Sequence, residues 1–195
     1  MDTAETHKDL PVLTFATVDQ WEEWLAASHT QTTGVWIKFA KKASGHTTVT
    51  YIEARDTALM YGWVDGLVNA YDEKFYVTRF MSRRPKSTWS KINKGVAEQL
   101  IKEGKMQPAG LKEVERAKAD GRWDAAYDPQ SSMEVSDEFS QALDKNPAAA
   151  EQFAAISKAN RYAFLYRLHH AKRAETKVSL IERFVEMLAA GETFH

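Results

Sequence analysis

The sequence predicts an α+β fold: a small, mostly antiparallel sheet packed with helices, followed by a helical C-terminal part. Short segments rich in β-formers recur in the first 85 residues, capping signals open helices between them, and only helical periodicity is found after residue 135. The length of 195 residues suits one domain with an appendage. We expect a polar lead-in over residues 1–13, an α+β domain over 14–123, a linker over 124–135 and a helical C-terminal module over 136–195.

The first part of the α+β domain is predicted to be a helix, a strand and a second helix. Thr17 and Gln20 stand at capping-box spacing and open the first helix. Residues 35–40 (VWIKFA) alternate and are rich in β-formers, which predicts a strand. Thr50 and Glu53 repeat the capping-box spacing and open the second helix.

Two further strands are predicted over residues 63–68 and 75–81, joined by the polar loop NAYDEK, and Pro85 ends the second. A helix is expected from about Ser90 to a stop near Gly104. Because side chains alternate along a strand, one face of the second strand carries every other residue. These residues are Phe75, Val77, Arg79 and Met81.

The rest of the chain is predicted to be helical apart from one linker. Pro108 suits the first turn of a helix. Residues 123–135 contain DPQSS and lack periodic hydrophobicity, which is typical of a linker. Beyond the linker, the helical pattern breaks at 146–147 (Asn-Pro) and continues through Phe153 and Ile156. Ser157 caps a further helix, and the last helix stops at Gly191.

The composition excludes several classes of protein. Lysine and arginine number 26 against 27 acidic residues, a net charge of −1, so the whole chain has no electrostatic preference for nucleic acid or an anionic membrane. The absence of cysteine excludes disulfides, thiolate metal sites and a cysteine nucleophile. The start, MDTAETHKDLPVL, lacks the pattern of a signal peptide, and no apolar run has the about 20 residues of a membrane helix. We therefore expect a cytoplasmic protein without membrane insertion.

A basic cluster between Arg79 and Lys105 is the main candidate site, with eight basic residues against Glu98 and Glu103. Arginine forks bind phosphate and carboxylate, a helix N-terminus adds donors, and a partly exposed Trp89 would stack on a ligand. We predict an anion-binding groove between the hairpin and the following helix. The alternative is a solvated basic face whose arginines pair with internal acids. The predicted ligand-binding residues are Asp65, Arg79, Arg83, Arg84, Trp89 and Lys91.

Asp65 has two functional interpretations and a structural one. It can orient an arginine of the groove, or act as a general base with a raised pKa. The structural alternative is an ion pair with Arg79, Arg83 or Arg84, or a turn aspartate before Gly66. A single carboxylate does not establish an active site, so no catalytic residue is assigned.

Other chemistry has little support in the sequence. There is no Walker loop, GxGxxG, GxSxG or HExxH pattern, so we expect neither a cofactor nor a metal. Trp36, Trp63 and Trp123 are expected to fill the junction between sheet and helices. The C-terminal helices carry basic residues that suit either DNA contact or a solvated helix surface, and the second interpretation is favoured.

Three long motifs resemble the bacterial YdeI/OmpD-associated family, also called bacteriocin-protection proteins. They are WVDG with RRPKSTWSKIN, KMQPAGLKEVERAKADGRWDAAY, and NRYAFLYRLHHAKRAETKVSLIERFVEMLAAGE. The resemblance spans residues 35–192. It implies an association with protection against bacteriocins or cationic antimicrobial peptides, and it brings no catalytic residues with it.

We therefore predict a stress-protection protein of the bacteriocin-protection type that binds an anionic small molecule or a protein partner at the basic groove. One alternative is an enzyme that acts on a phosphorylated or carboxylated small molecule, with Asp65 as general base. A further alternative is a DNA-contacting regulator that uses the C-terminal helices, although nucleic acid is not the favoured partner. The sequence does not determine an oligomeric state.

Overall fold

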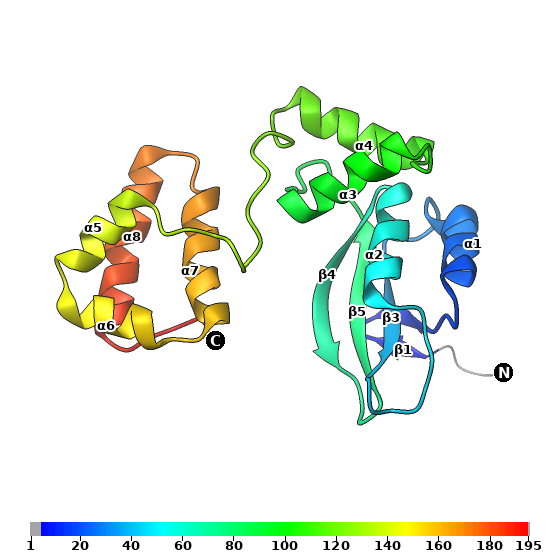
Figure 1. Cartoon of the computed structure of the whole chain (residues 1–195), viewed down its shortest axis with the longest axis horizontal. Helices are drawn as coiled ribbons and strands as arrows, with labels where there is room; N and C mark the ends of the chain where they lie inside the picture. Colours follow the sequence, from blue (N-terminus) through cyan, green and yellow to red (C-terminus); the bar gives the residue numbers. More distant parts are fainter. Residues whose placement is uncertain (1–4, 195) are drawn as a thin grey trace. The chain divides into compact units, whose positions relative to one another are not determined.

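The structure is a computed structural model that describes residues 5–194 (Figure 1). The chain forms two compact units. The N-terminal unit comprises the chain up to Trp89 together with Asn93–Ala126. The C-terminal unit comprises Ser90–Ile92 and the chain from Tyr127 onward. Each unit has its own core.

The N-terminal unit is built on a five-stranded sheet with the order β1-β2-β3-β5-β4. Strands β2 and β3 run parallel, and every other pair is antiparallel, which confirms the predicted mostly antiparallel sheet. The strands are β1 (Thr6–His7), β2 (Leu10–Leu13), β3 (Val35–Ala40), β4 (Trp63–Ala70) and β5 (Phe75–Ser82).

Strands β1 and β2 lie in the segment for which the sequence predicts only a polar lead-in. They form a tight hairpin in which Lys8 and Asp9 both have positive φ, as a two-residue turn between strands requires. Val12 pairs with Trp36 of β3, so β2 extends the sheet. Strands this short carry too little periodicity to be predicted from sequence. Residues 1–4 of the predicted lead-in lie outside the described residues.

Helices α1 (Val18–Ser28) and α2 (Tyr51–Met60) pack on one face of the sheet. Thr50 and Glu53 form the complete capping box that the sequence predicts for α2. The core under these helices is rich in aromatic rings, and the fully buried Trp21 donates its indole N–H to the backbone oxygen of Ala54 at 3.0 Å. Other members are Leu25, Phe39, Trp63 and Phe80.

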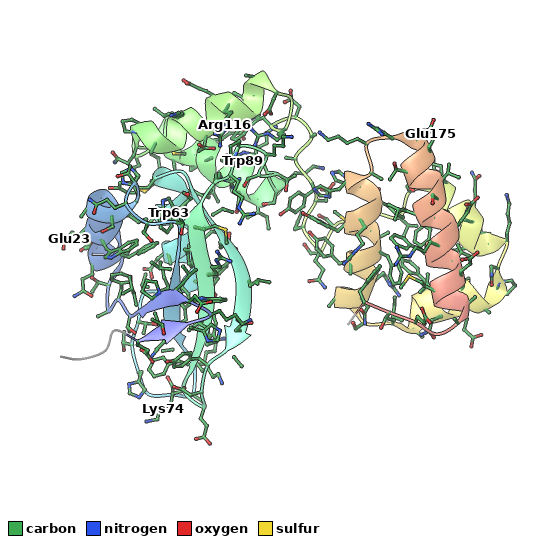
Figure 2. All side chains as sticks on the ribbon, turned by 180° about the vertical axis from the view of Figure 1, so that it is seen from behind. Glu23, Trp63, Lys74, Trp89, Arg116 and Glu175 are labelled. Atoms are coloured by element: carbon green, nitrogen blue, oxygen red, sulfur yellow. The ribbon has the colours of Figure 1, made fainter. Side chains whose placement is uncertain are left out.

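Helices α3 (Lys91–Lys102) and α4 (Pro108–Ala119) contribute to the same core. Trp63, Trp89 and Trp123 all belong to the same core, as predicted for Trp63 and Trp123. Figure 2 labels Trp63 and Trp89. Helix α4 approaches α2 closely because Gly110 has no side chain.

The opposite face of the sheet carries a second, smaller apolar cluster. It contains Val12, Trp36 and Val77, with Leu10 and Tyr71 packed against them, and no helix residue. The prediction that Trp36 fills the junction between sheet and helices is therefore wrong. Alternation along β3 turns Val35 and Ile37 toward the helices and Trp36 away from them.

The C-terminal unit consists of four helices, which confirms the predicted helical C-terminal part. Ser136, Asn146 and Ser157 each cap a helix through their side chains. Within residues 5–194, no helix combines the length and apolar character needed to cross a bilayer. The helices are α5 (Asp137–Asp144), α6 (Pro147–Ala155), α7 (Lys158–His170) and α8 (Ala174–Ala189), and their core is led by Phe139, Phe153, Phe164 and Phe184.

The packing of α4 on α2 predicts opposite effects of one substitution at two helical glycines. A Cβ at Gly110 would collide with the backbone oxygen of Met60 and the sulfur of Met106, so Gly110→Ala should lower the free energy of unfolding by about 1–3 kcal/mol. Nothing lies within 4 Å of a Cβ at Gly95 in α3, so Gly95→Ala should raise it by up to about 1 kcal/mol. Urea denaturation of the two variants measures both changes in the free energy of unfolding. Equal effects at the two positions would contradict the close approach of α4 to α2.

Candidate functional site

The turn between β5 and α3 holds three of the predicted ligand-binding residues, and two of them are buried. Arg83 is 6% exposed, donates to the backbone oxygen of Thr88 at 3.1 Å, and lies 3.6 Å from the centre of the Trp89 ring. Trp89 is 2% exposed, and its ring packs edge-on against the Trp123 ring with the ring centres 4.8 Å apart. The prediction of a partly exposed Trp89 is wrong because Arg83 and Trp123 cover its ring. Arg84 is exposed.

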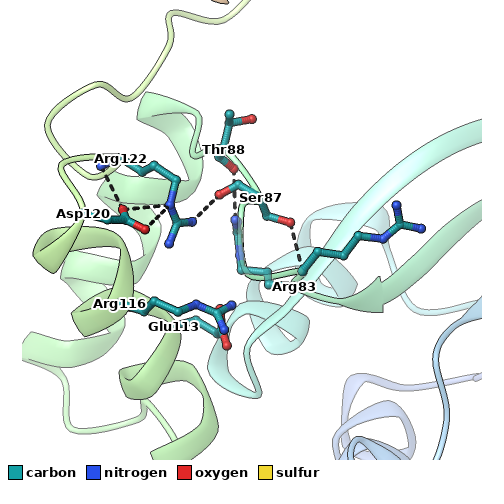
Figure 3. Close-up of polar contacts among 8 residues, drawn as sticks. Arg83, Ser87, Thr88, Glu113, Arg116, Asp120 and Arg122 are labelled. Carbon is teal, nitrogen blue, oxygen red and sulfur yellow. Dashed lines mark hydrogen bonds and ion pairs between the residues drawn. The ribbon is translucent and has the colours of Figure 1, made fainter.

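An arginine from the segment after α4 helps to hold this turn. Arg122 donates through Nη1 to the backbone oxygen of Ser87 at 2.5 Å and through Nε to Asp120 at 2.8 Å. Arg116 pairs with Glu113 nearby (Figure 3). The guanidinium groups of Arg83 and Arg122 therefore donate to backbone oxygens of one turn, an arrangement that favours a structural role for them.

Asp65 lies on the helix side of the sheet. It pairs across the strands with Phe80, which faces the core, and its carboxylate accepts a hydrogen bond from the hydroxyl of Tyr51 at 2.6 Å. Burial and then the bond to Asp65 raise the pKa of Tyr51 well above its ordinary value. The predicted partnership of Asp65 with an arginine is absent from the ion pairs of the described residues, and its observed partner is a tyrosine at the start of α2.

Arg79 lies on the opposite face, directly across from Trp36 in the β3–β5 ladder. This side of the sheet, formed by Val12, Trp36, Val77 and Arg79, is called the Trp36 face below. Two N–H groups on it, Nε of Arg79 and Nε1 of Trp36, are buried and have no hydrogen-bond partner within residues 5–194. Asp65 cannot orient Arg79 because the sheet separates them.

Two further groups flank Trp36. The His7 ring meets it edge-on at 4.7 Å, and Nζ of Lys8 lies 6.0 Å from its ring centre. Glu5, which directly precedes β1, is engaged with Lys38 and Tyr71. The cations Lys8 and Arg79 are thus both neighbours of Trp36, whose indole N–H has no partner within residues 5–194.

Lys91 belongs to the C-terminal unit and pairs with Asp128 at 2.8 Å, with its side chain 58% exposed. Both residues line a hollow of about 840 Å³ in that unit. A second ion pair in this hollow joins Lys177 to Glu138 at 3.0 Å. The two lysines that line the hollow are therefore already paired with acidic side chains.

Two arginines of α7 pack against their own unit. Arg161 donates to the backbone oxygen of Ala154 and lies over Phe153, and Arg167 lies 3.8 Å from the centre of the Phe194 ring. These contacts are those expected of a packed helix surface. They give the DNA-contacting alternative no support.

Two family models match the chain. Residues 13–113, just over half of the chain, match a family described as a domain of unknown function, DUF8412. The chain belongs to this family. Residues 132–191 match the OmdA family, described as bacteriocin-protection, YdeI or OmpD-associated, which confirms the predicted resemblance for the helical C-terminal part. No curated protein and no solved structure matched the chain.

The structure thus brings together, on the Trp36 face, residues that lie far apart in the sequence. Of the six predicted ligand-binding residues, Arg79 alone lies on the Trp36 face. Trp36 and Lys8 were not predicted for a site. The alternation in VWIKFA is the signal that distinguishes Trp36 from its neighbours, but it does not show which face the helices cover.

Removing the guanidinium of Arg83 should destabilise the N-terminal unit. Arg83→Ala deletes a buried hydrogen bond from a charged donor and the cation–π contact with Trp89, together worth about 2–3 kcal/mol of unfolding free energy. Arg84→Ala, at the exposed neighbour, should leave the urea midpoint unchanged. If both variants unfold like the wild type, the buried arginine is not the structural element inferred here.

Tyr51→Phe should reduce the loss of stability at alkaline pH. Because the folded-state pKa of Tyr51 is raised, the folded state keeps this proton more tightly than the unfolded state does. Its contribution is fully present below the unfolded pKa of about 10 and is lost as pH rises toward the folded pKa. Urea midpoints of wild type and variant, measured from pH 8 to pH 11, should converge above pH 10. Parallel curves would show that the Tyr51–Asp65 bond has no such effect.

Proposed function

We propose that this protein is a binding protein that takes an anionic group on the Trp36 face, with Arg79 as its central cation. The observation that carries the proposal is the pair of buried N–H groups, Nε of Arg79 and Nε1 of Trp36, which lack a hydrogen-bond partner within residues 5–194. A buried donor without an acceptor costs about 1–3 kcal/mol. A ligand oxygen that satisfies these donors removes that cost and therefore binds favourably.

The geometry of the two residues supports one shared ligand. Arg79 and Trp36 are directly opposite in an antiparallel pair, where Cβ atoms lie about 4.5–5.5 Å apart on the same face. A carboxylate or phosphate spans such a distance with two oxygens. The arginine fork and the indole N–H donate and cannot accept, so the site selects acceptor groups.

The local charge supports an anion over a neutral acceptor. Lys8 lies beside Trp36, and the guanidinium of Arg79 has no ion-pair partner among residues 5–194. Glu5 and Lys38 neutralise one another. An approaching anion thus meets two cations on this part of the sheet, and the attraction should weaken as the salt concentration rises.

The family match gives this proposal its setting. The family matched by residues 132–191 is described by bacteriocin protection, and a description of this kind names an effect and no reaction. We propose, by extension, that this chain is a protective protein and that it works by binding an anionic small molecule. The predicted Arg83–Arg84 groove is replaced here by a site at Arg79, because Arg83 is committed to Trp89 and Thr88.

The test follows the indole N–H resonance of Trp36 in ¹⁵N-labelled full-length protein, assigned with Trp36→Phe, during titration with inorganic phosphate or citrate. Saturable movement of this resonance is expected for the wild type. Arg79→Ala should weaken binding at least tenfold, and Arg79→Lys should weaken it less because it keeps the charge but loses the fork.

Arg84→Ala is the matched control, since it removes an arginine from the same unit away from the Trp36 face. It should bind like the wild type. An indole resonance that stays fixed at tens of millimolar anion, or an Arg79→Ala variant that binds normally, refutes the proposal.

A further inference from the structure

A pocket of about 580 Å³ lies among α1, α2 and α3 of the N-terminal unit. Its volume is within the range of about 300–1,000 Å³ that small-molecule sites occupy. All of its lining residues belong to this one unit. It lies among the helices, whereas the Trp36 face is formed by strands, so the function proposed above does not involve it.

The wall of the pocket is partly apolar. Each of the three helices contributes to it, with Val18 from α1, Met60 from α2, and Val96 and Leu100 from α3. Met60 and Leu100 are otherwise buried. An aliphatic or aromatic body bound here would remove this surface from water, at about 25 cal/mol for each Å².

The polar part of the wall is strongly acidic. Four carboxylates line the pocket against one lysine, Lys105, which gives a lining charge of 1 − 4 = −3. The carboxylates are Glu22, Glu53, Asp56 and Glu103.

The carboxylates keep capacity to accept further hydrogen bonds. Asp56 is paired with Arg55, and Glu103 with Lys105, but an ionised carboxylate has about four acceptor positions. Hydrogen bonds from Thr50 hold the pKa of Glu53 below its ordinary value, and contact with Lys105 does the same for Glu103. Both groups therefore stay charged at neutral pH.

Thr57 is an independent indication of a ligand. It lines the pocket, is 5% exposed, and its hydroxyl forms no hydrogen bond with another described residue. A hydroxyl that borders a pocket and has no partner in the protein is able to accept a hydrogen bond from a ligand.

We propose that this pocket binds an organic cation: a primary ammonium group attached to an aliphatic or aromatic body. The ammonium has three donors and no acceptor, which matches the carboxylates and the hydroxyl of Thr57. The apolar body would lie against Met60, Val96 and Leu100. The site takes a ligand of opposite charge to the one proposed for the Trp36 face, so the two are independent.

The experiment titrates the full-length protein with hexylamine at pH 7 and follows binding by calorimetry, with hexanol and hexanoate as matched probes. Hexylammonium should bind saturably. Hexanol should bind at least tenfold more weakly because it lacks the charge, and hexanoate should not bind. If hexanol binds as tightly as hexylamine, the acidic lining does not select the ligand and the proposal fails.

Variants locate the binding to the pocket. Glu22→Gln with Asp56→Asn should weaken hexylamine binding at least tenfold, and Val96→Trp should abolish it by filling the space. Glu98→Gln is the control, since it removes an exposed acid from α3 that does not line the pocket. Thr57→Val keeps the shape but removes the hydroxyl, so a several-fold loss is expected.

Thermal unfolding of each variant shows whether it is folded. Glu103→Gln replaces the double variant if that protein does not fold, and it should weaken binding about threefold. Normal binding by Val96→Trp, or by the folded carboxylate variants, overturns the proposal. Arg79→Ala should bind hexylamine like the wild type, which separates this result from that of the anion site.

Discussion

The antiparallel pairing of β3 with β5 is the constraint on which the arrangement of the N-terminal unit depends. It joins Val35–Ala40 to the strand that begins at Phe75 in one continuous register. Because successive side chains alternate between faces, this register sends Phe39 and Phe80 to the helix side and Trp36 and Arg79 to the other. A slip of one residue would exchange these sets, exposing aromatic rings and burying an arginine under the helices. The core and the proposed anion site are therefore fixed by the same hydrogen bonds.

Arg79 and Arg83 illustrate how the same residue type takes different roles four positions apart. Arg83 follows the end of β5, where its guanidinium lies over the Trp89 ring and donates to the backbone of the following turn. Arginine tolerates such a place because its planar group stacks on an aromatic ring while it donates at its edge. Arg79 remains within the strand, where its buried Nε has no hydrogen-bond partner within residues 5–194. This is the donor that we propose a ligand satisfies.

The helix side and the strand side of the N-terminal unit differ in electrostatic character. The pocket among α1, α2 and α3 gathers carboxylates, and the Trp36 face gathers cations around an indole. The near-zero net charge of the chain conceals this separation, because total charge is a sum and binding responds to local fields. Within residues 5–194, no group of three or more histidine, cysteine or acidic side chains is arranged to hold a metal ion.

The sequence by itself determined the mostly antiparallel sheet, the capped helices, the helical C-terminal part and the family resemblance there, because these depend on local periodicity, caps and long motifs. It also placed Phe75, Val77 and Arg79 on one face of β5. Only the tertiary structure decided which face the helices cover, and hence that Trp36 and Arg79 meet while Asp65 turns to Tyr51. It likewise decided that Trp89 is buried and that β1 and β2 join the sheet. These outcomes depend on contacts between residues that are distant in the sequence. A local sequence pattern carries no information about the energies of such contacts.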